Sequence, residues 1–103
     1  MGRPGTGLTM LLLPASLTAR EANDTRRLLT QAVKAESGAA VVVDASNLTH
    51  FDSSALAVLL ECHRAADAWG KPFELRHAPP KLAALARLYG VDALLLDAKT
   101  AAT

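Results

Sequence analysis

Residues 40–61 read AVVVDASNLTHFDSSALAVLLE and combine three features that together predict a fold. The run Ala40–Val43 is continuously apolar, which is typical of a central parallel strand buried on both faces. A polar loop from Asp44 to His50 follows it. A helix is then predicted from about Asp52 to Trp69, where a glycine ends it. This order predicts an α/β domain in which a buried strand leads, at its carboxyl end, into a helix start.

The segment before this stretch predicts another strand and helix. Residues 8–13 form an apolar run that Pro14 ends, which favours a strand over a short secretion signal. Thr18 and Glu21 have the spacing of a capping box, and the helix that they open is predicted to end near Glu36, before Ser37 and Gly38. Its buried face is predicted to comprise Thr25, Leu28, Leu29, Ala32 and Val33.

The segment after it predicts a third strand and two further helices. Residues 73–77 alternate apolar and polar, which indicates a strand near a sheet edge. Pro79 and Pro80 are expected to open a helix, because the first turn of a helix does not need their missing N–H groups. That helix is predicted to bury Leu82, Leu85, Leu88 and Tyr89 and to end at Gly90. Residues 91–96 predict a last short helix or turn.

The alternation of strands and helices predicts one α/β domain over residues 1–103, with a core at about 8–96 and a frayed tail at 97–103. Its sheet should be parallel or mixed. The chain is short, so its helices are expected to cover only one face of the sheet. The other face should then be polar, curved away or covered by a partner.

The composition and charge of the chain argue against several classes of function. The formal net charge is +1 and the only adjacent basic pair is Arg26-Arg27, which argues against nucleic-acid binding. Cys62 is the only cysteine and the three histidines are scattered, so neither a disulfide nor a metal site is expected, and no cofactor is. No segment has the roughly 20 apolar residues of a membrane span. Any membrane association would come through a partner, and a cytoplasmic location is expected.

The predicted start of the helix at Asp52 is the first candidate site. Asp52 is expected to cap the helix, which places the hydroxyls of Ser53 and Ser54 in its first turn, at the positive end of the helix dipole. A phosphate there would be favoured by the dipole and opposed by Asp44 and Asp52. On the residues alone, plain capping is favoured over a phosphate site.

The same helix carries two apolar stripes. Ala55, Val58, Leu59, Cys62, Ala66 and Trp69 form the predicted core stripe, and Leu56, Leu60, His63 and Asp67 form a second one. An exposed apolar stripe rimmed by polar groups often marks a protein contact. Alternatively, another helix of the same chain covers Leu56 and Leu60. The pattern leaves both readings open.

An enzyme is not expected. Ser53 or Ser54 with His50 and Asp44 would be the only candidates for a small hydrolase, but the Gly-x-Ser-x-Gly elbow and a pocket-forming second domain are missing. No Walker-type phosphate loop is present. Cys62 lies on the core stripe and is expected to be a buried small hydrophobe.

Residues 41–48 and 51–56, with the stretches 55–62 and 79–91, resemble the STAS domain, and more closely its MlaB-type members. The resemblance covers about residues 8–96. It implies a mixed β-sheet flanked by helices and no catalysis. It also implies a cytoplasmic accessory subunit, peripheral to the inner membrane, that binds and supports the ATPase of a phospholipid-transport ABC system and, through it, the permease. Such a system maintains outer-membrane lipid asymmetry.

By position, the resemblance implies a partner-binding surface at the helix start and along the helix: Asp52, Ser53, Ser54, Leu56, Leu60 and His63. It also offers an alternative, an anti-sigma factor antagonist that an anti-sigma kinase switches by phosphorylating Ser54. That family usually has glycine where this chain has Ala55, and MlaB-type members keep a hydroxyl residue at the position of Ser53. STAS domains usually have an additional first strand, which the seven residues before Leu8 leave shortened or missing.

Overall fold

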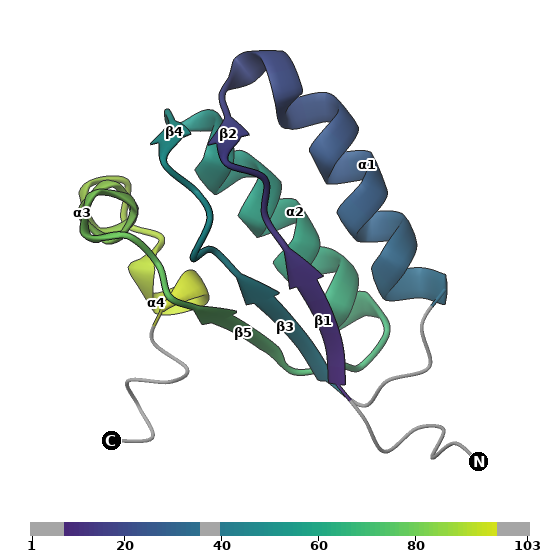
Figure 1. The fold of residues 1–103 in the computed structure, drawn as a ribbon. Helices are drawn as coiled ribbons and strands as arrows, with labels where there is room; N and C mark the ends of the chain where they lie inside the picture. Colours follow the sequence, from purple (N-terminus) through teal and green to yellow (C-terminus); the bar gives the residue numbers. More distant parts are fainter. Residues whose placement is uncertain (1–7, 36–39, 97–103) are drawn as a thin grey trace.

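The computed structural model describes residues 8–35 and 40–96. Within them lie five strands and four helices in the order shown in Figure 1. The strands are β1 (Leu8–Leu12), β2 (Ser16–Leu17), β3 (Ala40–Asp44), β4 (His50–Phe51) and β5 (Phe73–Arg76). The helices are α1 (Ala19–Ala35), α2 (Ser54–Ala68), α3 (Pro80–Leu88) and α4 (Asp92–Leu95). The predicted helix end at Ser37 and Gly38, the residues before Leu8 and the predicted tail lie outside the described residues.

The predicted sheet is confirmed and is parallel in the described part. Its order is β1-β3-β5, with β3 in the centre. Val42 faces Met10 on one neighbour and Glu74 on the other. The continuous apolar run therefore forms the central strand, and the alternating run forms an edge strand, as the two patterns predict.

The helices α1 and α2 lie together on one side of this sheet, and α3 and α4 lie beyond β5 (Figure 1). Val41, Val43 and Leu75 point into the core beneath α1 and α2. The opposite face of β1 leaves Met10 47% and Leu12 61% exposed. The expectation that the helices cover one sheet face holds for the described residues.

Four predicted core positions near helix ends or stripe edges are wrong. Leu28 is 66% exposed, because it lies about 100° around α1 from the buried Leu29. Trp69 is 56% exposed, because it is the residue at which α2 leaves helical geometry and the core stripe stops. At the end of α3, Leu88 and Tyr89 are likewise exposed, whereas the predicted Leu82 is buried.

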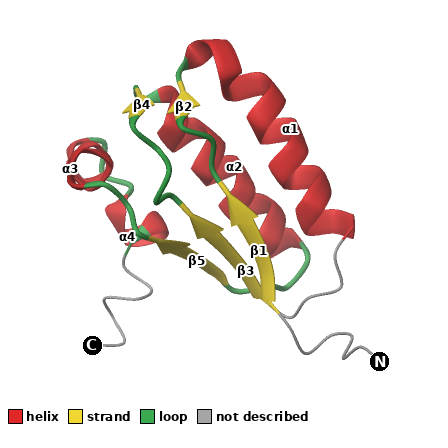
Figure 2. Cartoon of the chain, viewed as in Figure 1, coloured by secondary structure: helices red, strands yellow, loops and turns green. Residues whose placement is uncertain are grey.

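A pair of two-residue strands, not predicted from the sequence, sets the geometry of the site. β2 and β4 pair in parallel, with Ser16 opposite His50 and Leu17 opposite Phe51. The carbonyl oxygen of Ala15 accepts from the N–H groups of Thr49 and His50, both at 2.9 Å. Because α1 follows β2 and α2 follows β4, this pairing holds the starts of the two helices side by side (Figure 2).

Candidate partner-binding site

The Asp52 side chain caps the start of α2, as predicted, although the N-cap position itself is Ser53, one residue later than predicted. One carboxylate oxygen of Asp52 accepts from the N–H of Ser54 at 2.8 Å, and its carbonyl accepts from the N–H of Ala55 at 3.0 Å. The Ser54 N–H is the main cause that lowers the pKa of Asp52, and the N–H of Ala19 adds to it. Asp52 therefore interacts with the starts of both helices and is an anion at neutral pH.

The start of α1 is capped by a closed network. The N–H and the hydroxyl of Thr18 both donate to the Glu21 carboxylate at 2.8 Å, which lowers the pKa of Glu21. The hydroxyl of Ser16 also donates to Glu21, at 3.3 Å. The Glu21 half of the predicted capping box is confirmed. The Thr18 hydroxyl accepts from the backbone N–H of Arg20 at 3.3 Å instead of from that of Glu21, because the Glu21 N–H donates to the Thr18 carbonyl at 3.1 Å.

The two serines at the start of α2 have different surroundings. Ser53 is exposed and its side chain makes no capping hydrogen bond. Ser54 is half-buried, and its backbone N–H is already occupied by Asp52. Ser53 thus offers a free hydroxyl to a partner. A phosphate on Ser54 would stand beside the Asp52 carboxylate and would be repelled by it.

The predicted second stripe of α2 is divided by the fold. Leu56 is 3% exposed, so its prediction as an exposed contact residue is wrong and the alternative, cover by the same chain, is right for it. The ring of His63 packs edge-on against Phe73, with centroids 5.2 Å apart. Leu60 is half-buried and packs against the core from outside. Leu56 and His63 are covered because α3, α4 and β5 pack against the flank of α2 that carries them.

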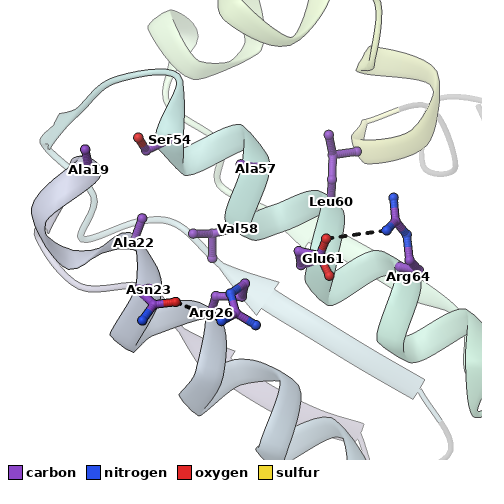
Figure 3. A pocket seen from close by; sticks show the side chains of 10 residues that line it. All are labelled: Ala19, Ala22, Asn23, Arg26, Ser54, Ala57, Val58, Leu60, Glu61 and Arg64. Atoms are coloured by element: carbon purple, nitrogen blue, oxygen red, sulfur yellow. Dashed lines mark hydrogen bonds and ion pairs between the residues drawn. The ribbon is translucent and has the colours of Figure 1, made fainter.

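A groove between α1 and α2 runs along the first turns of both helices. Its volume is about 510 Å³. Figure 3 shows its walls, and the lining residues are Ala19, Ala22, Asn23 and Arg26 from α1, and Ser54, Ala57, Val58, Leu60, Glu61 and Arg64 from α2. We call this feature the α1–α2 groove. Ser54 and Leu60 were predicted from the sequence to lie at the site, but the α1 wall was not. The small residues near both helix starts are the signal that could have indicated this wall.

A second, smaller groove lies on the other side of the α2 start. It has a volume of about 350 Å³ and is lined by Phe51 and by one face of α3: Lys81, Ala84, Leu85 and Leu88. Phe51 directly precedes Asp52. The exposed polar residues at the start of α2 therefore lie between two hollows of the surface.

The arrangement required for serine hydrolysis is not formed in the described residues. No hydrogen bond joins His50 to Ser53 or Ser54 there, and the Asp44 carboxylate contacts His77 at 3.3 Å. Asp44 also accepts from the Ser46 N–H at 2.8 Å, which is the main cause that lowers its pKa. Burial raises the pKa of Cys62 to about 11, so its thiol stays protonated and unreactive.

The described residues contain neither a candidate metal site nor a membrane-spanning helix. No group of three or more His, Cys, Asp or Glu side chains is placed to hold a metal ion. None of the described helices is long and apolar enough to cross a bilayer.

The arrangement of strands and helices defines the class of protein, a STAS-type domain. The chain is similar to a solved structure of the anti-sigma factor antagonist SpoIIAA in its unphosphorylated form, with a TM-score of 0.71. The identity is 16%, over 87% of this chain and 78% of that chain, so the likeness shows the fold. The family model described as "Mlab, STAS domain" matches residues 7–97. The chain therefore belongs to this family. No curated protein matches it significantly.

Proposed function

We propose that this protein is a non-enzymatic cytoplasmic subunit that binds and supports the ATPase of an ABC transporter for phospholipid trafficking and outer-membrane lipid asymmetry. The match to the MlaB-type STAS family over nearly the whole chain carries the proposal. The protein would be held at the inner membrane through the ATPase and its permease.

The start of α2 is the proposed contact surface. It presents the exposed hydroxyl of Ser53, the Asp52 carboxylate and the half-buried side chain of Leu60. Ser54 and His63 lie at its edges. Leu56 is left out of this surface, because it is buried and serves to hold α2 on the core.

A second candidate function, an anti-sigma factor antagonist, is favoured by one observation. The side chain of Ser54 lines an open groove, where a kinase could reach its hydroxyl. The structurally similar SpoIIAA is an anti-sigma factor antagonist, and its structure is that of the unphosphorylated form. Against this candidate stand Ala55, in place of the glycine usual in that family, and the Asp52 carboxylate beside Ser54.

Affinity purification from the native cells separates the two candidates. The full chain is tagged and recovered in mild detergent, and its partners are identified by mass spectrometry. Recovery of an ABC ATPase with its permease supports the transporter subunit. Recovery of an anti-sigma kinase, together with a phosphate on Ser54, would replace it with the second candidate.

The matched variants Leu60→Asp and Leu28→Asp test the surface. Both place a carboxylate at a leucine on a helix, but Leu28 is exposed on α1 and outside the proposed surface. Leu60→Asp should abolish recovery of the ATPase and Leu28→Asp should leave it unchanged, with folding of both checked by circular dichroism. A folded Leu60→Asp variant that still recovers the ATPase would contradict the proposed surface.

A further inference from the structure

The α1–α2 groove exists because small side chains face each other near the two helix starts. Ala19 and Ala22 on α1 stand opposite Ser54 and Ala57 on α2, with Val58 deeper between the helices (Figure 3). Small residues at such a face allow another backbone to approach closely. An incoming polypeptide would find an apolar floor there, and its burial would be favourable.

The groove is also positively charged on balance. It is lined by two arginines and one glutamate. Arg26 donates to the neutral amide oxygen of Asn23 at 2.8 Å, and among the described residues no carboxylate forms an ion pair with it. Arg64 pairs with Glu61 at 3.4 Å, with 76% of the Arg64 side chain exposed. Arg26 therefore has donors free for an incoming carboxylate.

We propose that the α1–α2 groove receives a segment of the partner protein that carries an aspartate or glutamate beside an apolar side chain. The acidic side chain would pair with Arg26, and the apolar side chain would lie over Ala57 and Val58. The inference deepens the proposed function and rests on it, since the partner expected there is the transporter ATPase.

The groove fits a polypeptide carboxylate better than a free phosphate. The Ser54 N–H, the donor that a phosphate at this helix start would use, is taken by Asp52 at 2.8 Å. The carboxylates of Asp52 and Glu61 would repel a dianion. A single carboxylate carries less charge, and the apolar floor adds a contact that phosphate cannot make.

Site-specific photo-cross-linking identifies the occupant directly. A photoreactive phenylalanine analogue is placed at Arg64, on the exposed rim of the groove, in the full chain in native cells, and at Asp67 as the control. Both residues are exposed on α2, but only Arg64 lines the groove. The Arg64 probe should cross-link to a partner peptide containing an Asp or Glu and an apolar residue, and the Asp67 probe should not. A cross-linked peptide without an acidic residue would overturn the proposal.

Two pairs of variants test whether the partner segment depends on the open space of the α1–α2 groove and on its positive charge. Ala57→Leu fills the groove, and Ala68→Leu makes the same change on the same helix outside it. Arg26→Glu reverses the charge in the groove, and Arg20→Glu reverses an exposed charge of α1 outside it. Each groove variant should weaken binding of the purified ATPase by at least about tenfold, as for a close interfacial charge pair, and each control by less than about twofold.

The outcomes separate this inference from the proposed function. If the wild-type chain and all four variants bind the ATPase equally, the groove is not the contact and the transporter function stands. If the wild-type chain does not bind the ATPase, the proposed function fails. The groove proposal is then supported if the peptide cross-linked at Arg64 contains an acidic residue, and overturned if it does not. Calorimetric binding of inorganic phosphate that Arg26→Glu abolishes would assign the groove to phosphate and overturn the proposal.

Discussion

The starts of α1 and α2 lie side by side and use similar residues in different ways. At α1, the Glu21 carboxylate accepts from the Thr18 N–H, the Thr18 hydroxyl and the Ser16 hydroxyl. At α2, Asp52 caps the helix and the Ser53 hydroxyl makes no capping bond. At the start of α1 the polar side chains therefore bond to one another and stabilise the helix. At the start of α2 the Ser53 hydroxyl remains available to a partner.

The largest expected effect comes from a core residue in the strand pair that directly precedes the two helices. Leu17 in β2 is fully buried, and β2 pairs with β4 just before α2. Leu17→Ala should lower the free energy of unfolding by about 2–5 kcal/mol, from the lost burial and the cavity left behind. Urea denaturation of the wild-type and variant chains measures it. A loss below about 1 kcal/mol would mean that the two starts do not depend on this common support.

A smaller difference in stability should distinguish Thr18 at the start of α1 from Ser53 at the start of α2. Thr18→Ala removes a capping side chain and should cost about 1 kcal/mol of stability. Ser53→Ala removes a hydroxyl without a capping bond and should change stability by less than about 0.5 kcal/mol. Thermal unfolding of both variants compares them. Equal losses would show that Ser53 is a structural cap after all.

The smallest effect is expected in acid. Hydrogen bonds lower the pKa of Glu21 and of Asp52 below their ordinary values of 4.5 and 3.8. A carboxylate with a lowered pKa in the folded state stabilises the fold above its ordinary pKa, and this contribution is lost as the pH falls through the folded-state value. Stability should therefore decline on acidification below about pH 4.5. Glu21→Gln and Asp52→Asn should each make that decline shallower in a pH series of thermal unfolding. An unchanged decline in both variants would place its origin elsewhere.

Periodicity and capping residues predicted the order of the helices and of the three strands of the main sheet, the central and edge strands, and the capping role of the Asp52 side chain. These predictions failed where burial depends on contacts with other elements, because such contacts leave no local pattern in the sequence. Leu28 and Trp69 belong to apolar stripes, but the width and length of the covered face depend on neighbouring elements. Leu56 looked like a surface residue for the same reason: nothing in α2 itself shows that other elements cover that flank.

The site could be predicted in part. Asp52, Ser53 and Ser54 were found because a strand, a loop and a capping residue occur in sequence there. The α1 wall of the groove was missed because it forms through the pairing of β2 with β4, and two residues are too few for a strand pattern. Arg26 contributes to the site only through this long-range contact.

The most direct test of the account is the affinity of the purified transporter ATPase for two variants of the full chain, Ser53→Arg and Thr18→Ala, each measured below its unfolding transition. We expect Ser53→Arg to keep the wild-type melting temperature and to bind at least about tenfold more weakly, a loss of about 1.4 kcal/mol. Thr18→Ala should melt at a lower temperature and bind like the wild-type chain. Unchanged binding by Ser53→Arg would contradict the claim that the start of α2 is the partner-binding surface.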